Sequence, residues 1–359
     1  MLENYNLEKR RGYLASPESY GVNNWKALAE LGVLALPFSE NVDGLGGQAA
    51  DLMVTCQTFG TGPLVEPFLS TILLCGHLIE MSGSAGQRDA YLPKIMSGEL
   101  RMALAYSERE ARFNISNHLT TAVQDQNGYQ LNGEKTFVLG GSFSTDVVLV
   151  LARTEGPQIS RTGLTLFSVP MNTKGVTSQD YKLVDGTPAM SLTFKNVALP
   201  ENAIVGDLHA AYDAIEFTLA RASLAMCSEA IGVMEALFGL TLEYLKTRKQ
   251  FGRPIGSFQA LQHRMAEHFV SLEQAKSIVM RAVATPLNDK PLWLSEIYGA
   301  KAFVSDVAMS LGQDAIQLHG GMGTTDELII SHYHKRLLFI QNLFGDAAHH
   351  YRQHLALTS

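Results

Sequence analysis

The period of the hydrophobic pattern changes twice along this chain, and that change constrains the fold more than any other feature. Across residues 25–98 apolar side chains recur at helical spacing, with glycine and proline at the breaks. Across residues 101–202 they form short runs rich in β-branched residues, and from about residue 208 long amphipathic helices return. Turn signals separate the short runs at Asn127-Gly128, Asn132-Gly133 and Lys174-Gly175. This order predicts an α+β protein with an antiparallel barrel or sandwich between two helical regions.

Composition excludes several classes of protein. The chain has 359 residues, enough for one large domain or a few small ones. Its net charge of −7 leaves no basic excess to neutralise phosphates, so no nucleic-acid partner is expected. Three scattered cysteines predict neither a disulfide framework nor a zinc site, and they indicate a reducing, cytoplasmic compartment. The charged N-terminus lacks a secretory signal, and no apolar run reaches the roughly 18 residues of a membrane helix, so no membrane association is expected.

The segment 244–259 is the most informative one for function. A helix through Tyr244, Arg248 and Phe251 would place these residues at i, i+4 and i+7, on one face. Such a helix would stop at Gly252 and Pro254. A guanidinium and an aromatic ring would then project together from a helix end, which suits a planar ligand that carries phosphate. The alternative is a surface arginine beside a core phenylalanine.

A second segment, 317–327, follows a long helical pattern and is rich in glycine. Gly320, Gly321 and Gly323 would let the backbone approach a ligand and expose N–H donors. Within it, Gln317 is a candidate ligand contact, and His319 is either a phosphate contact or a packed loop histidine. A Gly-Gly-x-Gly run alone is more typical of a plain turn between two helices.

Taken together, Arg248-Lys-Gln-Phe251-Gly252 and Gln317-Leu-His-Gly320-Gly321 resemble the acyl-CoA dehydrogenase family. In that family these two elements hold the diphosphate and adenosine end of FAD across a subunit interface. The resemblance covers nearly the whole chain. It is closest to the small-subunit type of pimeloyl-CoA dehydrogenase through the segments 255–264, 332–336 and 344–346.

The resemblance implies a fold, a reaction and partners. The fold would comprise an N-terminal α-helical domain at 1–100, a middle antiparallel β-barrel domain at 101–205, and a C-terminal four-helix bundle at 206–359. The reaction would be FAD-dependent α,β-dehydrogenation of an acyl-CoA thioester, as in fatty acid β-oxidation. The partners would be an acyl-CoA substrate, electron-transfer flavoprotein as electron acceptor, and a homo- or hetero-oligomer with a paralogous acyl-CoA dehydrogenase subunit.

The chain departs from this family where the catalytic base should stand. The reaction needs a carboxylate to take the α proton, and the family places a glutamate at one of two positions. Here those positions hold Phe344 and Ala222, the latter next to Arg221, and none of these can act as a base. The nearest carboxylate is Asp346, either a displaced base or a turn or helix-cap residue. The catalytic residue is therefore not assigned.

The flavin-facing half of the pattern is also altered. The family's Thr-Glu-Pro loop reads Ser107-Glu108-Arg109, which leaves Ser107 as a candidate cofactor contact. Glu108 is either a flavin-loop contact or a solvated charge. Leu139 replaces a threonine that flanks the flavin ring and offers no hydroxyl. These changes predict a subunit that lends its phosphate-binding residues to a partner's FAD.

The sequence is also compatible with three alternatives. The chain could be a self-sufficient homo-oligomeric dehydrogenase with an unorthodox base, a non-catalytic scaffold, or a flavin oxidase or monooxygenase of the same fold. No metal site is expected. His349, His350 and His354 have no acidic or cysteine partners nearby in sequence and are predicted to lie on a solvated helix face.

Overall fold

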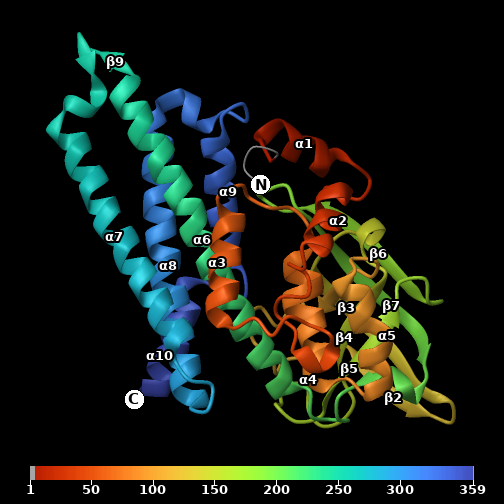
Figure 1. Ribbon diagram of the computed structural model, residues 1–359. Coiled ribbons are helices and arrows are strands. Elements are labelled where there is room, and N and C mark those ends of the chain that lie inside the picture. Colours follow the sequence, from red (N-terminus) through yellow and green to blue (C-terminus); the bar gives the residue numbers. More distant parts are fainter. Residues whose placement is uncertain (1–4, 359) are drawn as a thin grey trace. The chain divides into compact units, whose positions relative to one another are not determined.

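The computed structural model describes residues 5–358, which group into two units (Figure 1). A mixed unit combines residues 10–47 with 65–222 and contains the main β-sheet. A helical unit combines residues 5–9 and 48–64 with residues 223–358. Helix α6 (Tyr212–Thr247) contributes to both, because the division falls after Ala222.

The mixed unit is built around an eight-stranded sheet in which β6-β7-β3-β2-β4-β5-β8 are neighbours and β1 pairs with β4. Most pairings are antiparallel, as the short alternating runs predict, whereas β4 pairs in parallel with both β1 and β2. The strands are β1 (Met102–Ala105), β2 (Thr121–Asp125), β3 (Gly128–Leu139), β4 (Val147–Arg153), β5 (Leu164–Pro170), β6 (Val176–Lys182), β7 (Pro188–Leu199) and β8 (Ile204–Val205).

Burial follows the position of each strand in this sheet. Every residue of β4 is buried, as expected for an apolar run in the middle of a sheet, whereas β6 is polar and exposed at the edge. The predicted turn at Asn132-Gly133 is wrong, because both residues lie inside β3. Gly133 has φ +141° beside a register shift, so its glycine marks a bulge rather than a turn.

Most helical elements of the mixed unit precede the sheet in sequence, and two short 3-10 helices lie between strands. The segment η3 is a π-helix whose residues, apart from Leu69, are buried. The helical elements are α2 (Val22–Glu30), η2 (Glu40–Val42), η3 (Phe68–Gly76), α4 (His77–Ser82), α5 (Ala85–Met96), η4 (Ser142–Ser144) and η5 (Glu201–Ala203). The division between the units falls inside α1 (Leu7–Ala15).

The helical unit packs long helices around α6. Its elements are α3 (Ala49–Gly60), β9 (Lys249–Gln250), β10 (Arg253–Pro254), η6 (Ile255–Ser257), α7 (Gln259–Ala284), α8 (Lys290–His319), η7 (Gly320–Thr324), α9 (Ile329–Asn342) and α10 (Ala347–Thr358). Helix α3 crosses α6 closely, since a Cβ on Gly60 or Gly232 would collide with the facing backbone. Within the same unit, Arg336 on α9 donates to buried Glu229 on α6 at 2.5 Å.

Helix α6 is long and apolar enough, by length and composition, to cross a membrane. The expectation that no such run exists is therefore wrong. Most of its apolar window is buried inside the protein, which is typical of the central helix of a bundle.

Candidate functional site

The segment after α6 forms a β-hairpin instead of continuing the helix. Helix α6 ends at Thr247, and Lys249–Gln250 pair with Arg253–Pro254 in an antiparallel ladder. The two turn residues, Phe251 and Gly252, have φ values of +55° and +80°, which is the sign pattern of a type I′ turn. The prediction that the helix runs to Gly252, with Phe251 on its face, is therefore wrong. Strand pairing across a two-residue turn takes the place of the helical hydrogen bonds.

This hairpin holds an aromatic ring out in solvent at a conformational cost. Phe251 is 90% exposed, and a positive φ is unfavourable for a bulky residue. Its ring and that of Phe258 make a T-shaped contact with centroids 6.1 Å apart, and the Arg253 guanidinium lies 4.1 Å from the Phe258 ring centroid. The hairpin extends beyond the ends of α6 and α7 (Figure 1). Strained, exposed aromatic residues of this kind are typical of binding surfaces.

The glycine-rich segment at the end of α8 leaves its backbone open. Gly320 follows His319 with φ +62°, and its N–H donates to the Gln317 carbonyl to close the helix. A Cβ placed on Gly320 or on Gly321 would meet no heavy atom within 4 Å. The peptide groups of this turn can therefore be approached closely by a ligand.

The two motifs, about 70 residues apart in sequence, lie together in the helical unit. The ring of Tyr244 on α6 stacks on that of His319 on α8, with centroids 4.3 Å apart and planes 27° from parallel. Beside this stack, Leu245, Met265 and Leu318 form a buried apolar cluster. The structure thus brings Arg248 and Gly320 to the same end of the helical unit.

His319 is a packed histidine. It is buried, and its Nδ1 lies 2.8 Å from the Ala315 carbonyl oxygen. Burial lowers its pKa below the ordinary histidine value, while the hydrogen bond to Ala315 acts in the opposite direction. The ring is therefore neutral near pH 7 and carries its proton on Nδ1, since a carbonyl oxygen can only accept.

The two positions at which the sequence resemblance predicts the base hold no carboxylate. Ala222 is buried on α6, and Phe344 is half-buried with φ +62° in the loop before α10. Asp346 accepts a hydrogen bond from the backbone N–H of His349 at 2.7 Å and so caps α10. The geometry of Asp346 matches a helix cap, and its carboxylate is engaged with backbone.

A buried lysine, which the sequence reasoning missed, holds the loop that carries Phe344. The Lys301 ammonium donates to the carbonyl oxygens of Ile340, Gln341 and Gly345 at 2.8, 3.0 and 3.3 Å. Burial lowers the pKa of Lys301 to about 8. The available signal was a lysine between Ala300 and Ala302 within an apolar helix.

In the mixed unit, Glu108 is neither solvated nor free to contact a flavin. Its carboxylate accepts from Lys135 Nζ at 2.6 Å and from the backbone N–H groups of Leu119 and Thr120 at 2.7 and 3.1 Å. Burial acts to raise its pKa, but the His118 hydrogen bond and the Lys135 charge outweigh it and hold the pKa far below the usual range. Burial lowers the pKa of Lys135 to about 8. Sequence reasoning missed this cluster because Lys135 and His118 lie on separate segments.

The other flavin-side candidates lie beside this cluster. The Ser107 carbonyl accepts from the Thr136 N–H at 2.9 Å, so the end of β1 runs next to β3. Phe137 has φ +56° at an irregularity in β3, and its N–H donates to the Tyr181 hydroxyl at 2.9 Å. Leu139 is half-buried two residues further on.

The C-terminal histidines form no metal site. Among residues 5–358 no group of three His, Cys, Asp or Glu side chains could hold a metal ion. The prediction of a solvated face is wrong for His350, which is buried with its ring centroid 5.5 Å from that of Tyr298. Helix α10 packs against α8 and so encloses this residue.

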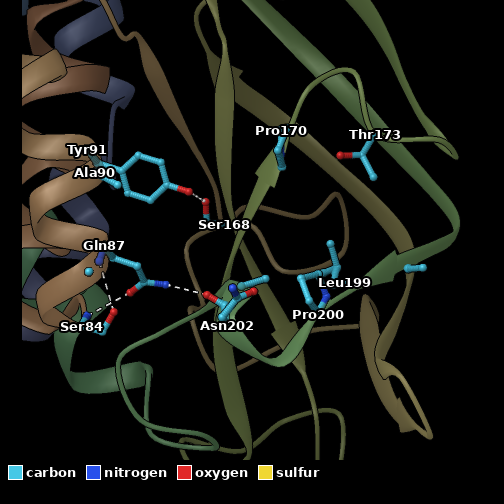
Figure 2. A pocket seen from close by; sticks show the side chains of 13 residues that line it. Ser84, Gln87, Ala90, Tyr91, Ser168, Pro170, Thr173, Leu199, Pro200 and Asn202 are labelled. Atoms are coloured by element: carbon cyan, nitrogen blue, oxygen red, sulfur yellow. Dashed lines mark hydrogen bonds between the residues drawn. The ribbon is translucent and has the colours of Figure 1, made fainter.

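The mixed unit contains a crevice of about 670 Å³, and none of the site residues described above lines it (Figure 2). Helix α5 forms one wall, and the Tyr91 hydroxyl meets Ser168 on β5 at 2.8 Å. Its lining has no carboxylate, lysine, arginine, histidine or cysteine, so it offers no group for acid–base chemistry near neutral pH.

Three family models match the chain consecutively. They are the acyl-CoA dehydrogenase N-terminal domain at residues 8–99, the middle domain at 103–197 and the C-terminal domain at 212–354. The chain therefore belongs to the acyl-CoA dehydrogenase family, and it has that family's order of helical, β and helical regions.

Curated relatives agree with this assignment. The chain is 30% identical over 295 residues to the probable acyl-CoA dehydrogenase fadE25 of Mycobacterium bovis, covering 80% of this chain and 75% of the relative. It is 28% identical over 305 residues to subunit CarC of the caffeyl-CoA reductase-Etf complex of Acetobacterium woodii, covering 84% of this chain and 80% of the relative.

Solved structures share the fold. A variant of the Tcur3481-Tcur3483 steroid ACAD superposes with a TM-score of 0.87 at 26% identity, covering 99% of this chain and 94% of that one. The FAD complex of PigA superposes with a TM-score of 0.88 at 25% identity, covering 98% of this chain and 93% of that one.

Proposed function

We propose that this chain is a subunit of an FAD-dependent acyl-CoA dehydrogenase and lends the diphosphate- and adenosine-binding residues to a partner's site. One observation carries the proposal. The helical unit assembles Arg248, Phe251 and the open glycine turn at Gly320–Gly321, whereas Phe344 and Ala222 occupy the two base positions. The chain is equipped for binding and lacks the usual proton acceptor.

The residues present fit the adenosine diphosphate end of FAD. The Arg248 guanidinium is exposed and can form paired hydrogen bonds with phosphate oxygens. Gly320 and Gly321 leave room for phosphate oxygens to approach their peptide groups, and Gln317 closes the same helix end. Phe251 offers an exposed flat surface. When bound, the flavin supplies the hydride-accepting chemistry of acyl-CoA dehydrogenation, and the protein supplies orientation.

The flavin-ring end fits less well. Leu139 offers no hydroxyl, and the Glu108 carboxylate is occupied by Lys135 and backbone donors. Ser107 remains as the candidate contact on this side. This asymmetry supports a hetero-oligomer in which a paralogous subunit carries the base and holds the flavin ring.

The names of two relatives support the proposed partners. The Tcur3481-Tcur3483 steroid ACAD bears two chain names, which supports a paired arrangement for this chain. The name of CarC includes an Etf complex, which supports electron-transfer flavoprotein as the acceptor. We further propose the small-subunit type of pimeloyl-CoA dehydrogenase, a cytoplasmic location, and domain boundaries at residues 100 and 205.

Co-expression with the paralogue, followed by FAD stoichiometry and acyl-CoA turnover, tests the proposal. The isolated chain should show little or no dehydrogenation, since a positioned base is worth roughly 10²–10⁴-fold in rate. The pair should retain FAD and turn over. Robust turnover of a saturated acyl-CoA by the isolated chain would contradict the proposal and favour a homo-oligomer with an unorthodox base.

A further inference from the structure

The Arg248 and Gly320–Gly321 groups stand on different helices, so something must fix the distance between them. The rings of Tyr244 and His319 stack with centroids 4.3 Å apart and so join the two helix ends. We propose that Tyr244 and His319 are a positioning pair that sets the spacing between the Arg248 guanidinium and the glycine peptide groups. This inference rests on the proposed function, because it assigns that spacing to the adenosine diphosphate end of FAD.

On the α8 side, the His319 ring cannot turn freely. Its Nδ1–H donates to the Ala315 carbonyl one helical turn back, and one ring face is covered by Tyr244. Gly320 follows directly, where the backbone changes to φ +62° and leaves the helix. Because His319 is the last residue of α8, these two contacts of its ring hold the backbone in place where the glycine turn begins.

On the α6 side, Tyr244 lies one turn before Arg248 and supports it directly. The Arg248 N–H donates to the Tyr244 carbonyl at 2.8 Å, and the Arg248 carbonyl in turn accepts from the Ile255 N–H at 2.8 Å. Next to Tyr244, Leu245 packs with Leu318, which is the neighbour of His319. The aromatic pair and this apolar contact together make one rigid joint between the two ligand-binding ends.

The test measures affinity for FAD and ADP, with riboflavin as a probe that lacks the adenosine diphosphate part. The full chain is used in the complex purified after co-expression with its paralogue. Tyr244→Leu and His319→Leu should each weaken FAD and ADP binding about two- to tenfold, the size expected for losing an aromatic pair. Riboflavin binding should not change. Tyr244→Phe keeps the ring and should bind FAD within about twofold of the unmodified chain.

A matched control lies on the same helix. Tyr298 forms another tyrosine–histidine pair, with His350, and stands 21 residues before His319 on α8, roughly 32 Å along the helix axis. Tyr298→Leu should lower thermal stability to a similar extent as Tyr244→Leu while leaving FAD and ADP affinity unchanged. The double variant Tyr244→Leu/His319→Leu should bind FAD no more weakly than the weaker single variant, because the two rings act as one unit.

The outcomes distinguish a failure of the positioning pair from a failure of the proposed function. If Arg248→Ala weakens FAD binding but Tyr244→Leu and His319→Leu do not, the positioning pair is rejected and the proposed function stands. Equal losses of FAD affinity in Tyr298→Leu also reject the pair. If Arg248→Ala itself leaves FAD binding intact, the proposed function fails. Should Tyr244→Leu not fold, a large affinity loss in the ring-preserving Tyr244→Phe would contradict the inference.

Discussion

The Asp346 carboxylate caps helix α10 through a 2.7 Å hydrogen bond from the His349 N–H. Asparagine caps helices as well as aspartate does, but it cannot accept the α proton as a base. Asp346→Asn should therefore leave stability nearly unchanged. Asp346→Ala should lower the free energy of unfolding by about 0.5–2 kcal/mol, measured by urea denaturation. If Asp346→Asn abolished turnover in the assembled enzyme, Asp346 would be the base after all.

Arg248→Ala should weaken FAD retention about ten- to a hundredfold. The lost contact is a charge-assisted one, worth on the order of 1.5–3 kcal/mol. Flavin content after gel filtration and a titration of flavin fluorescence measure the effect. Lys249→Ala, one residue further along the same hairpin, is the matched control and should retain FAD.

The C-terminal helices should lie in a subunit interface, since the phosphate-binding residues are proposed to serve a neighbouring chain. Apolar side chains on the outer face of α7 support this, including Phe269 at 51% exposure, Val270 and Met280. Light scattering at micromolar concentration should show a dimer or a larger oligomer, and a monodisperse monomer would contradict the proposal. Phe269→Glu should weaken the assembly, whereas Leu287→Glu in the α7–α8 loop should not.

Acid should destabilise the fold through buried neutral histidines. Burial, followed by the charges of Lys301 and His349, lowers the pKa of His350 to about 2, and burial lowers that of His77 to about 3. Below an unfolded value of about 6.5 the unfolded chain binds protons that the folded chain does not, so stability falls as pH falls. At pH 5 His350 alone would cost up to about 2 kcal/mol.

Urea midpoints at pH 7 and pH 5 measure this loss of stability. His350→Leu should reduce the difference between the two midpoints. A substitution at the exposed His263 should leave that difference as it is in the unmodified chain. An equal difference in all three proteins would exclude His350 as a source of the acid sensitivity.

Two glycines on α6 should respond oppositely to alanine. A Cβ at Gly232 would collide with the Gln57 carbonyl on α3, so Gly232→Ala should destabilise by about 1–3 kcal/mol or more. A Cβ at Gly239 meets nothing within 4 Å, and Gly239→Ala should stabilise by about 0.5–1 kcal/mol through the lower backbone entropy of alanine. Thermal unfolding of both variants checks the contrast.

The local sequence pattern was enough to predict those strands and turns in which the tertiary contacts favour the same structure as the local residues do. The run at 146–152 predicts a strand buried on both faces, because its apolar and β-branched residues do not alternate with polar ones. It nearly coincides with β4 (Val147–Arg153), every residue of which is buried. Asn127-Gly128 predicts a turn, and residues 126–127 do form the turn between β2 and β3, with Gly128 as the first residue of β3. Asn132-Gly133 has the same turn signal but lies inside β3. The pairing of β3 with β7 keeps the chain extended there, so the local turn preference is not realised.

Part of the candidate site could likewise be predicted from the sequence, and part could not. The residue types at 248, 251, 317 and 320 indicate a phosphate-bearing planar ligand, and the residue types at 344 and 222 exclude a carboxylate, because side-chain chemistry is readable from sequence. The hairpin that presents Phe251 could not be predicted from the sequence. The same residues are compatible with a helix and with a two-residue turn, and only the pairing of the two short strands decides between them.

The three-part order of the fold, the family, and the lack of a carboxylate at the two predicted base positions could all be derived from the sequence, since they depend on local period and on residue identity. Only the tertiary structure decided that Tyr244 stacks on His319, that Lys301 holds the loop of Phe344, and that Glu108 is enclosed by Lys135 and His118. Each of these contacts joins segments distant in sequence, and their geometry comes from the packing of whole helices and strands around a shared core.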